Sequence, residues 1–399
     1  MDQPSQQKDS RLAEPIVLLF ENSPFGTLDA IVQHDGKSVY FYLSEGQAQQ
    51  NSGNKNVFGT RACWVRNLEI GPLVLNEDEM RAGISPMLPR THCVVRESQP
   101  ATGAEQLRVV WLEEGNGAAL LESGDDDQEE MIAMIPPWSG LEGFHGYAKE
   151  CAMESPLCWP MPDNQKLNRR VTDADQFWRE WNGVSDPFAQ LQPQILASYD
   201  AKLLSGKKRS INEEDNPKYF SIDGGNFPPR GMVWYQHSDH VVIATVGLSV
   251  CPQPAVELFT DDPRNHRRIE LAIRLAGDFS SDAGQAKLKK LSQQLSGLAG
   301  YPWRNFTWLG AGHTCGLTNT LPNCESALLV SDRQIAVSPS DRIELPTFRD
   351  DPINLLWLVP IEPSVQQKLQ DKELSVEAVI ASHQDRSNQF QNPEQEPPT

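Results

Sequence analysis

Two histidines three residues apart stand before a long apolar run in HSDHVVIATVGLSV, residues 237–250. Imidazole is a common ligand of transition metals, so His237 and His240 could form half of a metal site. The residues after His240 favour a strand, in which side chains three positions apart point to opposite faces. A shared site would therefore need His237 in the preceding turn and further ligands from elsewhere in the chain. This periodicity argues against the two histidines acting together, and we predict no metal site.

A second candidate pair lies in GAGHTCG, residues 310–316, where His313 precedes Cys315 by two positions. A cysteine nucleophile needs a base that is held across space by a third group, and neighbours two apart in an extended chain share a face only loosely. The glycines lack the Lys-Ser/Thr ending of a phosphate-binding loop. A tight turn with a hydrogen-bonded histidine is therefore the favoured interpretation.

Motifs of the commoner enzyme classes are missing from the sequence. It contains no G-x-S-x-G nucleophile elbow, no H-E-x-x-H zinc helix and no G-x-G-x-x-G dinucleotide loop. We predict a protein that is not an enzyme and that binds no cofactor. The alternative is an enzyme that holds a metal at His237 and His240, or that uses His313 and Cys315 for nucleophilic catalysis.

Charge and composition narrow the class of partner. The 399 residues carry a formal net charge of −19, and such a surface repels the phosphates of nucleic acids. No apolar run approaches the length that spans a membrane, and the polar start MDQPSQQKDSR lacks the regions of a signal peptide. We therefore expect a cytoplasmic protein whose partner is neither a nucleic acid nor a membrane.

The seven cysteines indicate a reducing compartment. They are scattered, odd in number and without a C-x-x-C pair, so neither a disulfide framework nor a zinc knuckle is indicated. We interpret them all as reduced core thiols. They are Cys63, Cys93, Cys151, Cys158, Cys251, Cys315 and Cys324.

The elements that position these residues fall into two halves. In the first half, PIVLLF, SVYFYL and LRVVWLEE are rich in β-branched and aromatic residues and predict strands. LNRRVTDADQFWREW, residues 167–181, predicts a helix with Thr172 and Asp175 as a capping box for its second part. Residues 1–165 are thus expected to form a β-rich module, followed by a helical linker over 166–189.

The second half alternates strands and helices. HVVIATVGLSV predicts a strand buried on both faces, and RRIELAIRL alternates apolar with polar residues. Leucines spaced by three and four in DAGQAKLKKLSQQLSGLAG predict an amphipathic helix that ends at Gly300. SGKKRSINEEDNPK, residues 205–218, is typical of a charged loop, and Ser364 with Gln367 predicts the start of a last helix. The expected fold class is α+β.

Five segments of the second half, in this order and spacing, resemble the Suppressor of fused domain. They are ILASYDAKL, HVVIATVGLS, IELAIRL, LKKLSQQLSGLAGYPWRNFTWLGAGHTCGL and NLLWLVPIEPSVQQKL. The resemblance covers residues 190–383 and implies an α/β domain with a mixed sheet flanked by helices. Residues 384–399 are polar and rich in proline and are expected to form a disordered tail. The first half is similar to the leader module of bacterial members, mainly in VVWLEEGNGAALLE and FWREW.

This resemblance implies a binding fold rather than an enzyme. Animal members sequester a transcription factor by letting a short peptide add as a strand in a cleft, and bacterial relatives include immunity proteins that neutralise toxins. Ile243 stands where the family has a tyrosine, which removes a hydroxyl and an aromatic face from the expected cleft. The candidate partner-binding residues are His240, Ile243, Glu270, Arg274 and His313.

The leading hypothesis is therefore a cytoplasmic protein that binds and sequesters another protein. Its partner would be a peptide that adds as a strand, or a basic toxin that the acidic chain attracts and neutralises as a bacterial immunity protein. Beside the enzyme, a further alternative is a structural or regulatory module that associates with a copy of itself through a free sheet edge.

Overall fold

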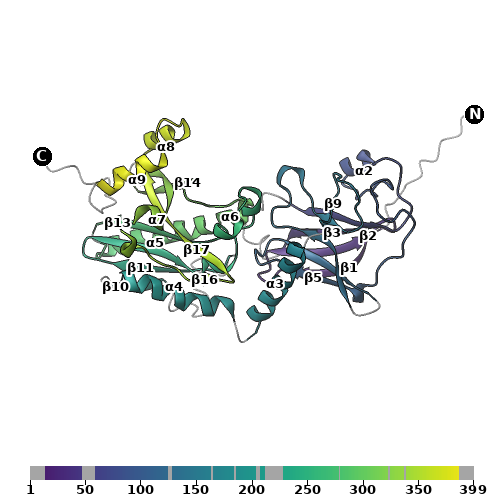
Figure 1. The fold of residues 1–399 in the computed structure, drawn as a ribbon, viewed down its shortest axis with the longest axis horizontal. Helices are drawn as coiled ribbons and strands as arrows, with labels where there is room; N and C mark the ends of the chain where they lie inside the picture. The colour runs from purple at the N-terminus through teal and green to yellow at the C-terminus, as the bar shows by residue number, and fades with distance from the viewer. Residues whose placement is uncertain are drawn as a thin grey trace, which may run out of the picture. The chain divides into compact units, whose positions relative to one another are not determined.

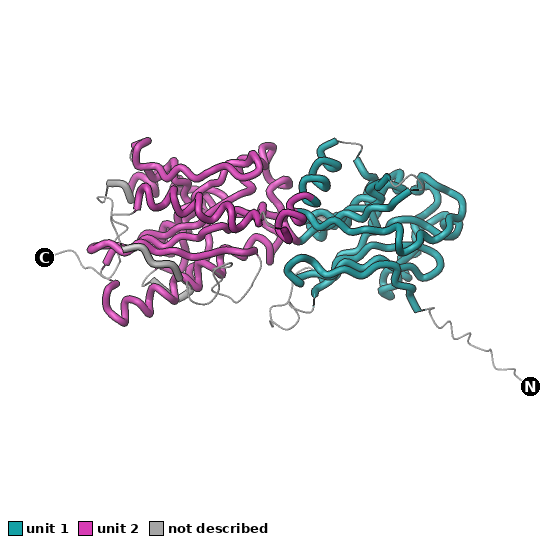
Figure 2. The backbone as a smooth tube through the Cα atoms, turned by 90° about the horizontal axis from the view of Figure 1, so that it is seen from below, with its two compact units in different colours: residues 1–112, 116–175 teal, residues 113–115, 176–399 magenta. Residues whose placement is uncertain are grey.

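The computed structural model of the chain describes most of its residues, which divide into two compact units (Figure 2). The first unit comprises residues 1–112 and 116–175, and the second comprises 113–115 and 176–399. The predicted tail lies outside the described residues from position 386 onward. The described residues are 14–46, 59–124, 128–162, 165–183, 186–203, 207–211, 228–277, 279–321, 324–336 and 338–385.

The first unit is rich in strands and contains two sheets. The first sheet is antiparallel in the order β1-β2-β3-β4, with β1 (Ile16–Asn22), β2 (Leu28–His34), β3 (Ser38–Glu45) and β4 (Arg61–Asn67). The second has the order β5-β6-β7-β8-β9, with β5 (Leu107–Trp111), β6 (Ala118–Ser123), β7 (Glu129–Ile135), β8 (Tyr147–Ala148) and β9 (Trp159–Pro160). Strand β4 packs against β7 and β8, and the side chains of Phe41 and Trp64 are fully buried. The short helix α2 (Glu77–Arg81) follows β4.

The second unit is organised around one mixed sheet of eight strands. Its main order is β10-β11-β12-β13-β17-β15-β14, and the short β16 also pairs with β17. Strands β13 and β17 run parallel, whereas the other pairs are antiparallel. The strands are β10 (Lys207–Ile211), β11 (Gly231–Gln236), β12 (His240–Val246), β13 (Arg268–Ala276), β14 (Thr314–Leu321), β15 (Cys324–Ser331), β16 (Thr347–Phe348) and β17 (Asp351–Ile361).

Helices flank this mixed sheet (Figure 1). Both α4 and α5 pack against β12, whose residues after His240 are all buried, as expected for a central strand covered on both faces. Helix α3 begins in the first unit and ends in the second. The helices are α3 (Gln165–Trp181), α4 (Pro187–Leu203), α5 (Asp282–Ala299), α6 (Tyr301–Asn305), α7 (Asp332–Ile335), α8 (Pro363–Gln370) and α9 (Val376–Asp385).

The predicted fold class is confirmed: a β-rich first part precedes a mixed sheet flanked by helices, and α5 ends where Gly300 caps it. Among the described residues, no helix is both long and apolar enough to cross a membrane. The exact domain boundaries expected from the sequence stay a prediction.

Three local predictions are wrong. Thr172 does not begin a helix, because α3 is continuous and the Thr172 hydroxyl donates to the carbonyl of Asn168, one turn earlier. The last helix is two helices, α8 and α9, and Glu362 rather than Ser364 occupies the N-cap of the first. Part of the expected charged loop forms β10, because pairing with β11 outweighs the local turn preference of that segment.

Candidate functional site

The two histidines of the opening motif close the turn between β11 and β12. His237 lies in the turn, where its backbone N–H donates to the carbonyl of His240 at 2.8 Å. The two imidazole rings stack with centroids 4.1 Å apart and planes 8° from parallel. The expectation that strand periodicity separates them is wrong, because the turn rather than a continuous strand sets the direction of His237.

The stacked rings are suited to contact rather than to metal binding. Burial lowers the pKa of both imidazoles, and the positive charge of Arg274 lowers it further. Arg274 stands opposite Val242, on the same face of the sheet as His240. No group of three or more His, Cys, Asp or Glu side chains in the described part of the chain could hold a metal ion. The structure therefore places Arg274 beside the stacked rings of His237 and His240, on the face of the sheet that His240 occupies.

Glu270 is fully buried and acts as an internal anchor. Its carboxylate accepts hydrogen bonds from the hydroxyl of Thr245 at 2.6 Å and from the backbone N–H of Gly247 at 3.0 Å. It also accepts from the N–H and the hydroxyl of Ser249, at 3.0 and 2.7 Å. Burial raises the pKa of Glu270, and these four donors offset part of that rise. The carboxylate thus fixes the turn after β12, where Gly247 has a φ of 85° that favours glycine.

Ile243 is likewise fully buried, opposite Trp234 on β11 and Ile273 on β13. Neither Ile243 nor Glu270 reaches the surface, so in this structure both support the sheet from within. Their role as partner contacts stays a prediction.

His313 is half-buried beside a cluster of aromatic rings. Its ring meets the edge of Trp308 at a centroid distance of 4.6 Å, and its Nδ1 accepts from the N–H of Gly310 at 3.3 Å. The predicted tight turn with a hydrogen-bonded histidine is confirmed. His266 and Phe259 also lie against Trp308, with centroids 5.7 and 6.5 Å away. Because the side chain of Phe259 is 56% exposed, the cluster presents an aromatic surface.

Strand β14 begins directly after His313 and is an edge of the mixed sheet. Within the described residues it pairs with β15 alone. The carbonyl of His313 accepts from the N–H of Leu329, so His313 faces β15 with its backbone groups. Along an antiparallel strand, residues whose backbone groups face the partner strand alternate with residues whose backbone groups face away. The N–H and C=O groups of Thr314 and Gly316 therefore point away from β15. Both residues are exposed.

Cys315 does not provide a nucleophile beside His313. Its thiol is 3.7 Å from the carbonyl of Ala327, whereas the His313 ring contacts Trp308 and Gly310. Burial raises the pKa of Cys315 to about 12, so the sulfur is a neutral thiol at physiological pH.

A buried charged network holds the parallel strands β13 and β17. Arg268 is fully buried and donates to the carboxylate of Asp351 at 2.9 Å, to that of Glu113 at 2.6 Å and to the carbonyl of Val250 at 2.7 Å. Arg267 donates to the same carboxylate of Asp351 at 2.6 Å. Nothing in the sequence indicates this network, because its members are far apart in the chain and each stands in an ordinary charged segment.

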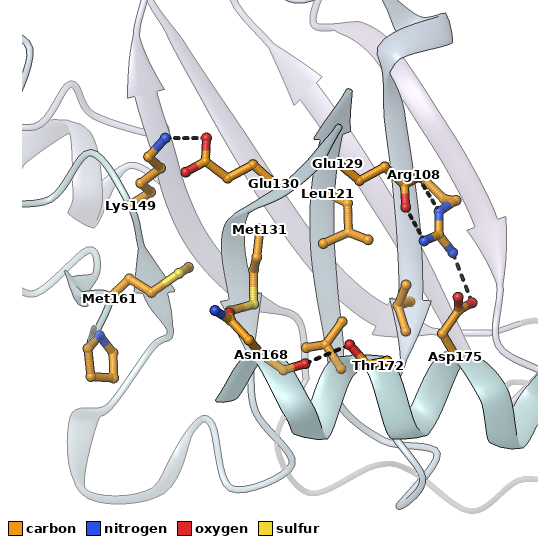
Figure 3. A pocket seen from close by; sticks show the side chains of 13 residues that line it. Arg108, Leu121, Glu129, Glu130, Met131, Lys149, Met161, Asn168, Thr172 and Asp175 are labelled. Atoms are coloured by element: carbon orange, nitrogen blue, oxygen red, sulfur yellow. Dashed lines mark hydrogen bonds and ion pairs between the residues drawn. The ribbon is translucent and has the colours of Figure 1, made fainter. Parts of the chain in front are cut away.

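A pocket with a volume of about 620 Å³ opens in the first unit, between the sheet of β5 to β9 and helix α3 (Figure 3). Arg108 at one end donates to Glu129 at 2.6 Å and to Asp175 at 2.9 Å, and Lys149 pairs with Glu130 at the other end. The lining residues are Arg108, Val110, Leu121, Glu129, Glu130, Met131, Lys149, Met161, Pro162, Asn168, Val171, Thr172 and Asp175.

The charged side chains of this pocket are paired with one another: Arg108 with Glu129 and Asp175, and Lys149 with Glu130. Asp175, which the sequence predicted to be part of a helix cap, instead forms an ion pair with Arg108. The strand pattern around Arg108 gave no signal of this partner, 67 positions later in the chain.

Comparison with known proteins bears on the second unit. Residues 227–390 match the model of the family described as Suppressor of fused protein (SUFU). A structure search finds "the Sufu-Fu complex crystal structure", with 11% identity, a TM-score of 0.30, and coverage of 46% of this chain and 79% of that chain. No curated protein matches. By the family match, residues 227–390, which contain β11 to α9, form a Suppressor of fused-like domain.

Proposed function

We propose that this chain is a protein-binding protein without catalytic activity, and that an extended segment of its partner adds as a strand to the outer edge of β14. The observation that carries the proposal is the position of β14 at the edge of the mixed sheet, within the Suppressor of fused-like domain. The N–H and C=O groups of Thr314 and Gly316 are available to an added strand. Such addition takes its affinity from main-chain hydrogen bonds.

Selectivity would come from the aromatic cluster next to this edge. Trp308 and His313 lie immediately before β14 in the chain, and the exposed ring of Phe259 stacks beside Trp308. An apolar or aromatic side chain of the partner can bury against these rings, and large aromatic contacts dominate the energetics of many interfaces. The edge therefore binds the main chain and the cluster selects side chains.

A finer form of the proposal concerns the kind of partner. The net charge of −19 favours a basic protein, because long-range attraction speeds the encounter of opposite charges. We therefore keep a basic toxin, neutralised in the cytoplasm by a bacterial immunity protein, as the proposed partner. Purified chain added to a toxin-activity assay should lower that activity, with the effect weakening as salt rises.

Blocking the edge tests the proposal directly. Gly316→Pro removes the outward N–H without removing a donor to β15, and Gly316→Ala is the matched control, since a Cβ at this position meets open space. We expect the wild type and the alanine variant to retain a protein partner from the native host at low salt, and the proline variant to lose it. Equal retention by the proline variant would contradict strand addition at β14.

A second candidate function is self-association, which a feature of the first unit favours. Strand β1 pairs with β2 alone within the described residues, and Ile16, Val17 and Phe20 on it are 54 to 58% exposed. An edge strand that exposes apolar side chains and carries no lysine is a template for pairing with another chain. An antiparallel pair of identical strands closes on a two-fold axis, so a second copy is the natural partner.

A further inference from the structure

The aromatic cluster beside β14 is closed by one loop of the second unit. This loop runs from Phe259 to His266, and the rings of both residues lie against Trp308. Between them the loop carries two adjacent carboxylates, Asp261 and Asp262, and both residues are exposed. Because Asp261 is two positions from Phe259, their Cα atoms are at most about 7 Å apart. The loop therefore keeps negative charge next to the aromatic rings.

The positive charges of the same loop and its end are directed elsewhere. Arg264 and Arg267 both pair with the buried carboxylate of Asp351, at nitrogen–oxygen distances of 3.4 and 2.6 Å. Neither Asp261 nor Asp262 forms an ion pair with a residue that the structure describes. These two exposed carboxylates are therefore the uncompensated charge of the loop.

A buried glutamine holds the two sides of the aromatic cluster in place. The side-chain amide of Gln253 donates to the carbonyls of His266 and Leu309, each at 3.1 Å. Its oxygen accepts from the backbone N–H of Leu309 at 2.8 Å. Gln253 is fully buried, and Leu309 directly follows Trp308 in the chain. The amide thus ties the backbone beside Trp308 to that of His266, so the rings are positioned before any ligand arrives.

The rings of the cluster are suited to contact with a cation. The ring planes of His266 and His313 lie at 72° and 75° to that of Trp308, whereas the ring of Phe259 lies at 20° to it and Phe259 is 56% exposed. The faces of phenyl and indole rings are negative and attract cations. Burial lowers the pKa of His313, which favours the uncharged form of its ring at neutral pH. The cluster therefore offers an aromatic face beside two carboxylates that lack a basic partner.

We propose that the aromatic cluster, together with Asp261 and Asp262, binds an arginine side chain of the partner. This inference rests on the proposed function, because the site lies beside the edge to which the partner strand would add. A guanidinium group is planar, stacks on aromatic faces and is more weakly hydrated than an ammonium group. Its plane would lie on the exposed ring of Phe259, and its charge would meet the two carboxylates. Arginine is also enriched among the residues that dominate the energetics of interfaces.

Binding of a capped arginine tests the proposal without a partner protein. N-acetyl-arginine amide is titrated into the full chain at constant ionic strength, and the indole N–H signals are followed by nuclear magnetic resonance. N-acetyl-citrulline amide is the control probe, because citrulline has nearly the same shape without the charge. We expect the arginine probe alone to shift one indole signal, which is missing from Trp308→Phe. No shift, an equal shift with citrulline, or a shift of another indole would overturn the proposal.

Phe259→Ala identifies the ring that holds the probe. Since Phe259 is 56% exposed, its loss should not unfold the chain. We expect this variant to bind the arginine probe about 2- to 30-fold more weakly, which is the range that cation–aromatic contacts produce. Tyr301→Ala removes an exposed ring from α6 and is the matched control, so it should bind as the wild type does. Equal binding by the two variants would overturn the proposal, and this pair decides if Trp308→Phe is misfolded.

Removing the two carboxylates tests the contribution of charge. Asp261→Asn combined with Asp262→Asn should weaken binding of the arginine probe by about 2- to 5-fold, because exposed charges are screened. Glu97→Gln combined with Glu154→Gln removes the same charge from exposed positions of the first unit and should have no effect. Equal weakening by both double variants would show a response to net charge alone and would overturn the site.

Gly316→Pro separates this inference from the proposed function. The variant blocks strand addition at β14, whereas the arginine probe needs only the rings and the carboxylates, so its response should persist. Absence of an arginine response in the wild type would overturn the arginine site and leave strand addition to the partner-retention experiment. Retention of the partner by Gly316→Pro would overturn strand addition, whether or not the probe binds.

Discussion

Strands β1 and β14 are both sheet edges that pair on one side only within the described residues, yet they expose different side chains. On β1 the apolar side chains of Ile16, Val17 and Phe20 are exposed, and its one carboxylate, Glu21, accepts a hydrogen bond from Trp111. On β14 the residues with outward backbone groups, Thr314 and Gly316, are small, and the aromatic surface lies beside the strand rather than on it.

A free sheet edge does not by itself determine which partner binds to it. Both strands offer the same unpaired N–H and C=O groups, so the main chain alone would accept any extended segment. The side chains decide: an apolar strip that matches itself favours a second copy, whereas small residues beside an aromatic cluster leave room for a different chain. If the proposed function holds, the first unit and the second would bind different partners.

The largest expected effect comes from breaking the buried ion pair in the sheet whose edge is β14. Arg268→Ala removes the fully buried partner of Asp351, which keeps only the more exposed Arg267 and Arg264, and breaking a buried ion pair costs about 3–5 kcal/mol of unfolding free energy. We expect the second unit to unfold at a lower denaturant concentration, while the unfolding midpoint of the first unit stays unchanged. The variant would thus destabilise β14 and leave β1 unaffected. Hydrogen exchange resolved on β1 and β14 measures this.

Arg264→Ala is the matched control, because this arginine is 61% exposed and its nitrogen lies 3.4 Å from the same carboxylate. Exposed pairs contribute at most about 1 kcal/mol, so the control should leave both midpoints nearly unchanged. A loss of protection of equal size on β1 and β14 in the Arg268 variant would refute the separate roles of the two units.

The next effect changes β1 alone. Val17→Lys places a charge on the apolar strip, and burying a valine side chain contributes about 1.5–3 kcal/mol, so self-association should weaken at least about 10-fold. Light scattering over a range of concentrations measures it. Gly316→Pro, which blocks the other edge, should associate as the wild type does. If both variants associate equally, β1 is not the interface.

Much of the framework could be predicted from the sequence, because local patterns report burial directly. The leucine spacing and Gly300 predicted α5, and the apolar run after His240 predicted a strand covered on both faces. The α+β class followed from the order of such elements. Each of these features depends on the spacing of residues within one segment, and that spacing can be read directly from the sequence.

The site could be predicted only in part, because contacts between distant segments leave no local pattern. Glu270 alternates with apolar neighbours like a solvent-facing residue, yet the turn after β12 folds over it and buries it. Arg268 and Asp351 meet across 83 positions. His313 was found from the sequence, because its turn is local, whereas its aromatic neighbours were not.

The smallest expected effect is one of pH at β14. Burial lowers the pKa of His313, the residue before this strand, below the ordinary imidazole value of about 6.5. As the pH falls, His313 therefore takes up a proton in the unfolded chain before it does so in the folded chain. The stability that the neutral His313 ring contributes to the folded state is complete above about pH 6.5 and is lost as the pH falls below that value. Amide protection of β14 should thus decline from about pH 7 to about pH 5, measured by hydrogen exchange corrected for the intrinsic rate at each pH.

His313→Gln should lessen this decline on β14 and leave that on β1 unchanged, because a glutamine does not titrate. His237 and His240, whose pKa values are also lowered by burial, stay in place and account for the pH dependence that persists in the second unit. An unchanged slope on β14 in the His313→Gln variant would show that protonation at this turn is not coupled to the edge. Partner binding at β14 would then depend on its backbone groups and on the aromatic rings alone, and it would not vary with pH over this range. The two edges would in that case differ only in the shape of their side chains.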